Sequence, residues 1–266
     1  MEPAITLAPR SVLFVPAVRP SMIAKAAGLP ADLIVLDLED AVRDADKAGA
    51  REALPVSLEL LHGRCAGVRI NAPGTPYFAE DLAAIRLANV ALVVVPKVES
   101  PADLAQLAGH PVLAMIETPA GVLAAPQIAA TPGVVGLMVG TNDLAASLRL
   151  PPGAGRGSLS HALQTVVIAA RAAGGWAIDG VFNALKDAAG LAQECADGRL
   201  MGFDGKSLIH PDQIAVANTA FSPSAAEIEE ATALVAAARG GAERFQDRMI
   251  EDMHVEMARR TLQRAP

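Results

Sequence analysis

One carboxylate stands at the end of an apolar segment and is followed almost at once by a proline. In AMIETPAGV, residues 114–122, Glu117 comes directly after residues that are typical of a buried strand. A buried carboxylate without a partner is costly. Glu117 must therefore lie at a rim or be held by a cation.

A second carboxylate, Asp143, follows the next apolar segment along the chain. Two hard oxygen ligands, completed by waters and a substrate, are the usual arrangement for Mg²⁺, with Mn²⁺ as a substitute. No His or Cys accompanies the pair, which argues against zinc. Glu117 and Asp143 thus predict a magnesium site. The alternative is that both carboxylates accept hydrogen bonds from loop amides.

Three further acids stand within four residues in the segment VLDLEDAV. Strand alternation puts Asp37 and Glu39 on one side and Asp40 on the other. Three metal ligands from one strand end would be crowded. We therefore expect these acids to orient metal-bound water or to pair with Arg69 or Lys97.

Two cations end apolar segments and have distinct chemistry. Arg69, in VRIN, offers a planar fork that suits a carboxylate or a developing enolate. We expect Lys97 to pair with one of the acids of VLDLEDAV. The alternative is that Lys97 forms a Schiff base with the substrate. A metal pair nearby would make the Schiff base unnecessary.

Strands must position these side chains, and short β-branched segments alternate with alanine-rich helical segments eight times. Continuous apolar strands separated by helices indicate a parallel sheet covered on its outside. Eight such units in about 210 residues predict an α/β fold, a closed (β/α)8 TIM barrel. An open doubly wound sheet is the alternative, but no G-x-G-x-x-G segment follows the first strand. The expected strands are residues 11–17, 33–40, 67–73, 90–97, 112–118, 133–140, 175–182 and 202–210.

Polar residues collect where these strands end, and barrel active sites lie at that face. Glu117 is therefore expected at the rim of a shared mouth. The alternative is that each polar residue is simply the first solvated residue of a loop. The set is Asp37, Glu39, Asp40, Arg69, Asn71, Lys97, Glu99, Glu117, Asn142, Asp143, Asp179, Asp204, Lys206 and His210.

Composition excludes several classes of protein. The net charge is −7, with one Trp and one Tyr, which argues against a nucleic-acid surface. The apolar segments are shorter than the ~18 residues of a membrane span. MEPAITLAPR has no signal-peptide pattern, and Cys65 and Cys195 form no disulfide framework. We expect a cytoplasmic protein without a nucleic-acid or membrane partner.

We expect two parts in the chain. Residues 1–220 would form the TIM-barrel catalytic domain, and residues 221–266 a C-terminal helical extension or lid, for which packing on a neighbouring subunit is one of the open arrangements. A long helix over 224–245 and a tail over 249–263 make up this extension. We expect it to lack a core of its own.

Eight segments in order along residues 10–220 resemble the HpcH/HpaI aldolase and citrate lyase superfamily, specifically its CitE-like (citrate lyase beta-subunit-like) CoA-ester lyases. The segments are RSVLFVPAVRP, DLIVLDLEDAV, VRIN, VVPKVES, IETPAG, GTNDLA, AIDGVF and GFDGKSLIHPDQI. The resemblance implies a barrel lyase that uses Mg²⁺ to cleave a citryl-CoA- or malyl-CoA-like 3-hydroxy-acyl-CoA into an acyl-CoA and a keto acid.

The resemblance also implies residue roles. Glu117 and Asp143 match the metal ligands, and Arg69 matches the substrate arginine, with a catalytic role. Substrate contacts would also come from Glu117, Gly140 and Asn142. CoA would be held by Phe14, Arg19 and Lys25.

The chain departs from the family pattern at three places. Ala17 replaces a usual glycine, and Asn142 stands where an acid is usual. In the tail, the family aspartate that serves a neighbouring subunit as acid/base corresponds to Glu251, with Asp252 next to it. Either tail carboxylate could act at the acyl-CoA carbon. The alternative for the tail is an amphipathic surface helix.

Several reactions and assemblies share these features. A metal aldolase acting on free hydroxy-keto acids would not need the CoA cations. A malyl-CoA-type thioesterase would differ by an activated water, and a non-catalytic subunit would only bind acyl thioesters. The family implies homo-oligomers, trimers or hexamers. An acyl carrier protein in a larger complex is the alternative carrier to CoA.

Overall fold

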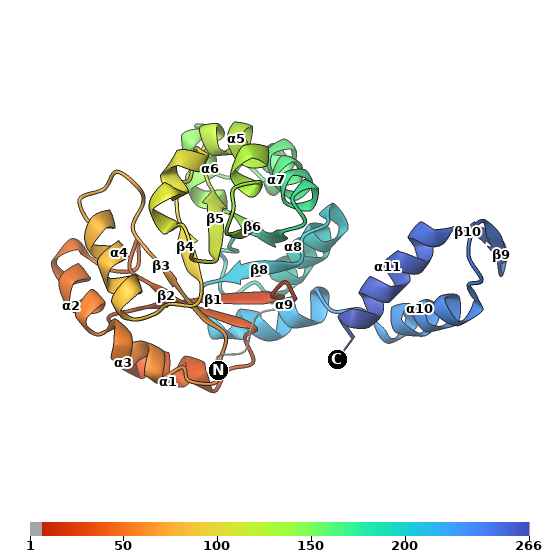
Figure 1. The fold of residues 1–266 in the computed structure, drawn as a ribbon, viewed down its shortest axis with the longest axis horizontal. Helices are drawn as coiled ribbons and strands as arrows, with labels where there is room; N and C mark the ends of the chain where they lie inside the picture. The colour runs from red at the N-terminus through yellow and green to blue at the C-terminus, as the bar shows by residue number, and fades with distance from the viewer. Residues whose placement is uncertain (1–6, 266) are drawn as a thin grey trace. The chain divides into compact units, whose positions relative to one another are not determined.

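Eight parallel strands close into a barrel in this computed structural model, which describes residues 7–265 (Figure 1). Residues 1–6, part of the segment examined for a signal peptide, lie outside the described range. The strands follow one another around the barrel in chain order, and β1 pairs with β8 to close it. The predicted TIM barrel is confirmed, and the open sheet is wrong. The strands are β1 Ser11–Pro16, β2 Leu33–Asp37, β3 Ala66–Arg69, β4 Val93–Val95, β5 Val112–Ile116, β6 Val134–Val139, β7 Trp176–Asp179 and β8 Gly205–Leu208.

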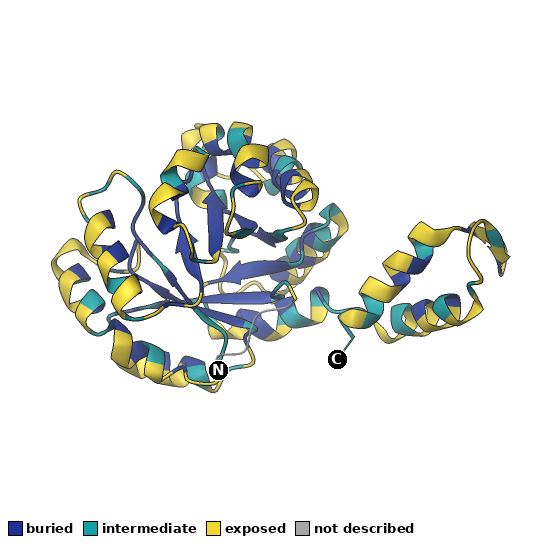
Figure 2. Ribbon diagram, in the orientation of Figure 1, coloured by how far each residue is buried: buried dark blue, intermediate teal, exposed yellow. Residues whose placement is uncertain are grey.

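Helices surround the barrel and expose their outer faces, while the strands are buried (Figure 2). After β4 the connection is a 3₁₀ helix, Pro101–Leu107. Within residues 7–265, no helix combines the length and the apolar character that crossing a membrane requires. The helices are α1 Pro20–Ala27, α2 Lys47–Glu52, α3 Leu54–Glu59, α4 Phe78–Leu87, α5 Pro119–Ala129, α6 Thr141–Ser147, α7 Ser160–Ala172, α8 Ala188–Met201 and α9 Ile214–Ala220.

The barrel interior is packed with alternating apolar side chains from the strands. Side chains of successive strand residues point to opposite sides, so every second residue faces this core. Each fully buried side chain of this size contributes roughly 1.5–3 kcal/mol of transfer free energy. The buried cluster is Val12, Leu33, Val35, Leu92, Val94, Leu113, Met115, Met138 and Ile178.

The turn from β5 into α5 shows how local sequence places a polar side chain at the strand end. Thr118 caps α5, because its hydroxyl accepts a hydrogen bond from the backbone N–H of Gly121 at 3.1 Å. Pro119 occupies the first turn, where a missing N–H costs nothing. Glu117 is therefore fixed between the last residue of β5 and the cap of α5.

The chain divides into two compact units, one up to Asn218 and the other from Thr219. The C-terminal unit contains α10 (Ala225–Ala237), a hairpin of β9 (Glu243–Phe245) and β10 (Arg248–Ile250), and α11 (Asp252–Gln263). Its buried side chains form a cluster of their own, so the expectation of an extension without a core is wrong. The cluster is Ala231, Leu234, Phe245, Ile250, Val255 and Ala258.

The predicted long helix over 224–245 is also interrupted. The helix ends at Ala237, and Gly240 and Gly241 follow with φ of +102° and +78°. A left-handed backbone cannot continue a right-handed helix, and glycine adopts it at little cost. The chain therefore turns into the β9–β10 hairpin.

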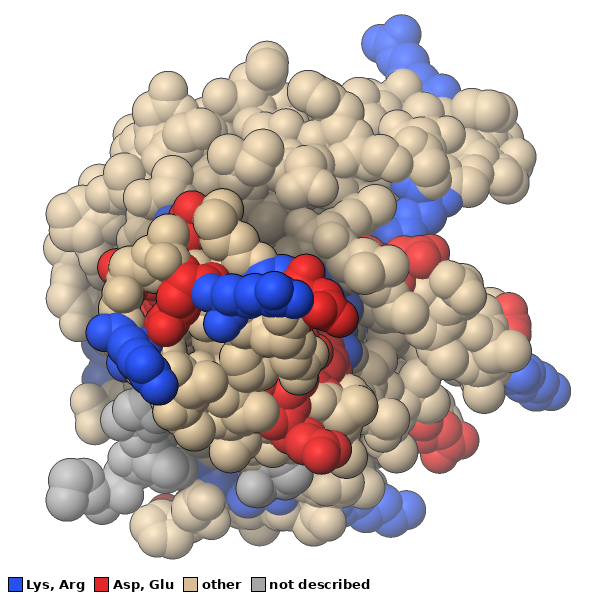
Figure 3. All heavy atoms as spheres, turned by 90° about the vertical axis from the view of Figure 1, so that its right-hand side faces the viewer, with Lys and Arg blue, Asp and Glu red and all other residues tan. Residues whose placement is uncertain are grey.

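On the face drawn in Figure 3, side chains of both charge signs are interspersed among larger uncharged areas.

Candidate active site

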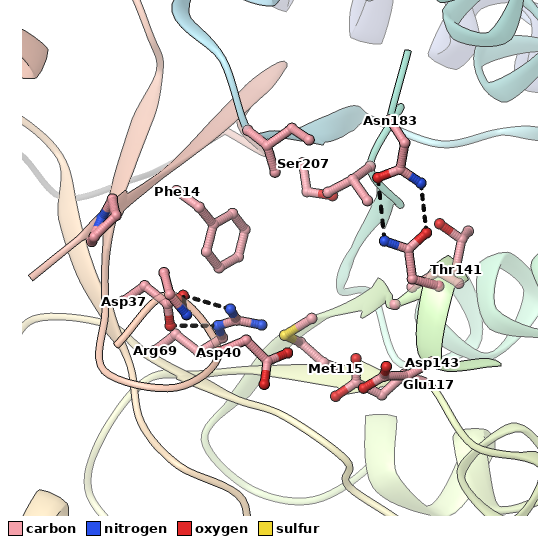
Figure 4. A pocket seen from close by; sticks show the side chains of 17 residues that line it. Phe14, Asp37, Asp40, Arg69, Met115, Glu117, Thr141, Asp143, Asn183 and Ser207 are labelled. Atoms are coloured by element: carbon pink, nitrogen blue, oxygen red, sulfur yellow. Dashed lines mark hydrogen bonds and ion pairs between the residues drawn. The ribbon is translucent and has the colours of Figure 1, made fainter. Parts of the chain in front are cut away.

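A cavity of about 390 Å³ opens at the carboxyl ends of the strands (Figure 4). Its wall contains the last residue of several strands or the residues that follow directly, as a barrel active site requires. Six of the fourteen polar residues singled out from the sequence line it: Asp37, Asp40, Arg69, Glu117, Asn142 and Asp143. The lining residues are Phe14, Pro16, Asp37, Asp40, Ala41, Arg69, Met115, Glu117, Val139, Gly140, Thr141, Asn142, Asp143, Val181, Asn183, Ser207 and Ile209.

Arg69 is held in the cavity wall by a two-point contact with Asp37. Its Nε and Nη2 donate to the two carboxylate oxygens of Asp37 at 2.7 and 2.6 Å. The guanidinium also lies over the ring of Phe14, 4.9 Å from its centroid. Burial favours loss of the proton, but the hydrogen bonds and charge of Asp37 outweigh burial and raise the Arg69 pKa. Arg69 is thus a fixed cation with a defined orientation.

Glu39 connects the two cations of the site. Its Oε2 lies 2.8 Å from Nη1 of Arg69, and its Oε1 accepts from Nζ of Lys97 at 2.7 Å. Burial raises the pKa of Glu39, while the charges of Arg69 and Lys97 oppose that rise. The pairing predicted for the acids of VLDLEDAV is therefore observed for Asp37 and Glu39. Asp37 and Asp40 both line the cavity.

Lys97 adopts a backbone conformation that is unusual for lysine, with φ of +52°. Its backbone N–H donates to Oε1 of Glu117 at 2.7 Å, and its Nζ lies 3.1 Å from Asp143. Burial lowers its pKa, but hydrogen bonds to Glu39 and Asp143 and the charges of Glu39 and Glu117 outweigh burial and raise it. A nucleophilic Schiff-base lysine needs the neutral amine. This environment favours the ammonium and disfavours that alternative.

Glu117 and Asp143 lie next to one another in Figure 4, and both contact Lys97. Glu117 is 3% exposed, and the pKa of its carboxyl is raised to about 7, first by burial and then by the charge of Glu39. Its carboxylate lies directly against Gly140. A Cβ at that position would stand 2.0 Å from Oε2 of Glu117. Only glycine at 140 leaves room for this carboxylate.

The donor set fits magnesium. Within residues 7–265, no group of three or more His, Cys, Asp or Glu side chains is arranged to hold a metal ion. Two carboxylates at the edge of a wet cavity are nevertheless what Mg²⁺ commonly uses, because it retains waters and substrate oxygens as its other ligands. A cation here would also offset the unfavourable burial of Glu117.

The residues predicted to hold CoA divide between two cavities. Phe14 lines the first cavity, while Arg19 lines a second, more open cavity of about 740 Å³ together with Arg43. Ala41 borders both cavities, so the two adjoin. Lys25 is exposed on the last turn of α1 and is not among the residues that line either cavity.

Glu251 and Asp252 belong to the C-terminal unit. Glu251 caps α11, and its backbone N–H donates to Nδ1 of His254 at 3.0 Å. Asp252 accepts from the backbone N–H of Gly241 at 3.1 Å. Both carboxylates therefore stand at the junction between the hairpin and α11.

Two polar strand-end residues predicted at the mouth face the other side of the barrel wall. Asp179 and Lys206 are fully buried and form an ion pair of 2.9 Å. Glu194 of α8 also contacts Lys206 at 2.7 Å, and Arg156 contacts Asp179 at 2.9 Å. Because strand side chains alternate, Ser207 reaches the cavity in place of its neighbour Lys206. The prediction is wrong for Asp179 and Lys206.

Asn71 and Asp204 also bond away from the cavity. Asn71 accepts from Nζ of Lys47 at 2.7 Å and donates to Asp81 at 2.6 Å. Asp204 pairs with Arg171 at 2.8 Å and accepts from a backbone N–H at the start of the neighbouring strand. Neither lines the cavity, so the prediction of a place at the mouth is wrong for both.

Sequence reasoning did not find Asn183, which lines the cavity after β7. Its amide exchanges hydrogen bonds with Asn142, at 2.7 Å in one direction and 3.3 Å in the other. A signal was present, because Asn183 is the first polar residue after the expected seventh strand segment. Asp179, within that segment, was the residue predicted at the mouth.

Comparisons with known proteins agree with this geometry. The family model described as HpcH/HpaI aldolase/citrate lyase matches residues 10–211. A (3S)-malyl-CoA thioesterase of Cereibacter sphaeroides is 42% identical over 268 residues, which cover 96% of this chain and 94% of that protein. A citrate lyase subunit beta-like protein of Mycobacterium tuberculosis is 40% identical over 263 residues, with 95% and 94% covered.

Among solved structures, CitE of M. tuberculosis in complex with magnesium, acetoacetate and coenzyme A has a TM-score of 0.85. It is 38% identical and covers 97% of this chain and 98% of its own. This chain belongs to the HpcH/HpaI aldolase/citrate lyase family, which confirms the resemblance. Its relatives include citrate lyase beta-like proteins. The cofactor prediction is confirmed at the level of this neighbour, which holds magnesium and coenzyme A.

Proposed function

We propose that this protein is a Mg²⁺-dependent CoA-ester lyase that cleaves a 3-hydroxy-acyl-CoA into an acyl-CoA and a 2-oxo acid. The observation that supports this most is the convergence of Glu117, Asp143 and Arg69 on one cavity. A relative with the same fold has been solved with magnesium, acetoacetate and coenzyme A. Glu117 and Asp143 would hold the ion, with Gly140 leaving room for Glu117.

Magnesium, when bound, would polarise the hydroxyl and carboxylate oxygens of the substrate. A water molecule or a carboxylate of the cavity would accept the hydroxyl proton, the oxygen would form the new C=O of the 2-oxo acid as the carbon–carbon bond breaks, and the electron pair of that bond would pass to the thioester as an enolate. Arg69 has five N–H groups, of which two donate to Asp37, while Glu39 contacts its Nη1 as an ion pair at 2.8 Å. The remaining donors stabilise the developing negative charge.

The other predicted roles complete the proposal. Phe14, Arg19 and Lys25 would hold the CoA moiety, with Arg19 in the adjoining second cavity. A tail carboxylate, Glu251 or Asp252, would protonate the enolate carbon from a neighbouring subunit. This arrangement implies a homo-oligomer, a trimer or hexamer, working in the cytoplasm on a small acyl-CoA or on an acyl carrier protein.

A substrate screen tests the proposal. Citryl-, malyl-, methylmalyl- and citramalyl-CoA are incubated with the protein and Mg²⁺, and release of a 2-oxo acid is measured. We expect release from at least one thioester, with loss after EDTA and recovery with Mg²⁺ or Mn²⁺. Equal cleavage of free hydroxy-keto acids would indicate an aldolase. Tight binding of thioesters without any product would indicate a non-catalytic binding subunit.

One observation favours a second candidate, a thioesterase. The relative from C. sphaeroides, 42% identical to this chain, carries the name (3S)-malyl-CoA thioesterase. Such a reaction adds water across the carbon–sulfur bond and releases CoA with a free thiol and a hydroxy acid. The same cavity could serve both reactions, so only the products separate them.

A further inference from the structure

A buried lysine that the proposed mechanism does not use lies next to the active site. Lys47, the first residue of α2, is 4% exposed and is not among the residues that line either cavity. Its Nζ donates to the backbone carbonyls of Leu38 and Glu39 at 2.9 and 3.0 Å and to Oδ1 of Asn71 at 2.7 Å. A lysine side chain has three N–H donors, so these three neutral oxygens use all of them.

Two of these oxygens belong to the turn that follows β2, and this turn carries an acid of the active site. Asp37 ends β2 and accepts two backbone N–H groups of the turn, at 2.9 and 3.1 Å. Glu39, within the turn, contacts Arg69 at 2.8 Å and Lys97 at 2.7 Å. The N–H groups of the turn are therefore held by Asp37, and its carbonyl groups are held by Lys47.

Asn71 and Asp81 connect Lys47 to the neighbouring strand and helix. Asn71 stands two residues after β3, and its Nδ2 donates to Asp81 at 2.6 Å and to the carbonyl of Leu38 at 3.1 Å. Asp81, on α4, is fully buried and also accepts from Nε of Arg51 at 2.6 Å. Because Lys47 and Arg51 both lie on α2, the network ties the turn to α2, to α4 and to the segment after β3.

The position of Lys47 is costly for stability. A buried charge whose donors reach neutral oxygens loses its hydration without a counter-charge in direct contact. The ring of Tyr77, with its centroid 5.1 Å from Nζ, offsets part of this cost. An apolar side chain of similar length would avoid the cost altogether. Filling space therefore does not account for a lysine at this position.

What Lys47 supplies is backbone geometry. The carbonyl groups of Leu38 and Glu39 flank the Cα atom of Glu39, one on each side. Hydrogen bonds from one nitrogen to both oxygens restrict the two dihedral angles between them, φ and ψ of Glu39. These angles set the direction of the Cα–Cβ bond, so they determine where the carboxylate of Glu39 lies.

We propose that Lys47 is a positioning residue of the active site, which orients Glu39 and through it Arg69 and Lys97. Arg69 is supported by two acids, of which Asp37 is drawn with its contacts in Figure 4. Displacement of Glu39 leaves the guanidinium with one support and releases one contact of Lys97. The catalytic consequence rests on the proposed function, whereas the geometric role does not.

Hydrogen exchange of the backbone, followed by mass spectrometry, tests the geometric role without any measurement of activity. Lys47→Met keeps the length of the side chain and removes its three donors. We expect the backbone N–H groups of residues 38–42 to exchange about tenfold faster in this variant, because the turn opens more often once its carbonyls are released, while exchange in α7 stays unchanged. Unchanged exchange over residues 38–42, or an acceleration spread equally over the barrel, overturns the inference.

Lys206→Met is the matched control for this measurement. It also replaces a buried lysine by methionine, but Lys206 contacts Asp179 and Glu194 rather than the turn after β2. We expect exchange over residues 38–42 to stay at the wild-type rate in this variant. Acceleration there equal to that in Lys47→Met would show that the turn responds to the loss of any buried lysine, and would overturn the inference.

Steady-state kinetics test the consequence for catalysis. In Lys47→Met we expect kcat on a thioester substrate to fall by about 10- to 100-fold, since displacement of a positioned group by about 1 Å can have such an effect. KM should stay within about twofold of the wild-type value. An unchanged kcat in the folded variant overturns the positioning role. If the wild-type protein cleaves no thioester, the proposed function fails, and the exchange measurement decides the inference.

A second variant, Lys47→Arg, decides the question if Lys47→Met does not fold. It retains the positive charge, but a planar guanidinium cannot direct its N–H groups to the three oxygens as an ammonium does. We expect faster exchange over residues 38–42 and a lower kcat than in the wild type. Wild-type exchange and kcat in Lys47→Arg would then overturn the inference.

Discussion

Asp37 and Glu117 are both buried carboxylates at strand ends, but their surroundings differ. Asp37 receives two N–H groups of Arg69 and two backbone N–H groups, so its charge is well compensated. Glu117 receives one backbone N–H and lies near Glu39, which together with burial raises its pKa to about 7. Glu117, whose negative charge is less well compensated than that of Asp37, is thus the residue proposed to hold a cation.

Removal of either proposed ligand should weaken Mg²⁺ binding without unfolding the protein. We expect Glu117→Gln and Asp143→Asn each to lower Mg²⁺ affinity by on the order of tenfold or more and to abolish turnover, because each removes one of two anionic ligands. Calorimetric titration with Mg²⁺ measures the affinity, and circular dichroism checks the fold. Glu99→Gln, an exposed strand-end acid outside the cavity, is the matched control. Wild-type affinity in both ligand variants would contradict the site.

Gly140 offers a test that leaves all carboxylates in place. In Gly140→Ala the added methyl would overlap the Glu117 carboxylate and displace it. We expect Mg²⁺ affinity to fall by about 10- to 100-fold, the usual effect of disturbing the support of a metal ligand. Gly155→Ala is the control, since a Cβ there meets nothing within 4 Å. Unchanged affinity in Gly140→Ala would argue against Glu117 as a ligand.

At the scale of elements, a buried charge cluster ties β7 and β8 to the surrounding segments. Asp179 contacts Lys206 of β8 and Arg156 of the connection before α7, and Lys206 contacts Glu194 of α8. Removing one partner of a buried pair leaves an uncompensated charge. We expect Asp179→Asn to lower the free energy of unfolding in urea by about 3 kcal/mol or more.

A surface pair provides the comparison for this stability prediction. Asp46 pairs with Arg43, which is 86% exposed, and such pairs contribute about 1 kcal/mol or less. Asp46→Asn should therefore change the unfolding free energy only slightly. A similar small change in Asp179→Asn would show that the cluster is not what holds β7 and β8 to the helices.

The loop after β1 should determine affinity for the CoA end of the substrate. Arg19 lines the second cavity with Arg43, where phosphates would be attracted. We expect Arg19→Ala to raise the KM for a CoA substrate severalfold with little change in kcat. Added salt should reduce the difference in KM between the wild type and the variant, because it screens the attraction between Arg19 and the phosphates. Cleavage of a free acid, where it is measurable, should be unaffected. An unchanged KM would remove Arg19 from the CoA site.

Features that depend on local sequence patterns are predictable from the sequence, whereas features that depend on contacts between residues far apart in the chain are not. The alternation of apolar segments and helices predicts the barrel, and chain order alone brings Glu117 and Asp143 together after adjacent strands. The direction of Asp179 and Lys206 was missed because a shift of one residue within a strand moves a side chain to the other face. The Asn142–Asn183 contact joins residues 41 positions apart through loop geometry, which no local pattern specifies.

At the scale of the whole molecule, the C-terminal unit has its own core and carries Glu251 and Asp252. We expect Glu251→Gln to slow carbon–carbon cleavage strongly with little effect on CoA affinity, and Asp252→Asn to matter less, because Asp252 already accepts a backbone N–H.

Subunit mixing tests whether the tail acts between chains. Arg69→Ala and Glu251→Gln proteins, each expected to have little activity alone, should regain partial activity when they are mixed and exchange subunits. Absence of recovery despite demonstrated exchange would contradict sharing of sites. Full activity of a chain truncated before Met249 would remove the tail from the mechanism altogether.

The most direct test of the proposed function is a product balance from one thioester substrate. Malyl-CoA or citramalyl-CoA is incubated with the wild-type protein and Mg²⁺, and 2-oxo acid, acyl-CoA and free CoA thiol are quantified together. The lyase predicts equal amounts of 2-oxo acid and acyl-CoA, no free thiol, and no products after EDTA. Free thiol with a hydroxy acid and no 2-oxo acid would contradict it and identify a thioesterase.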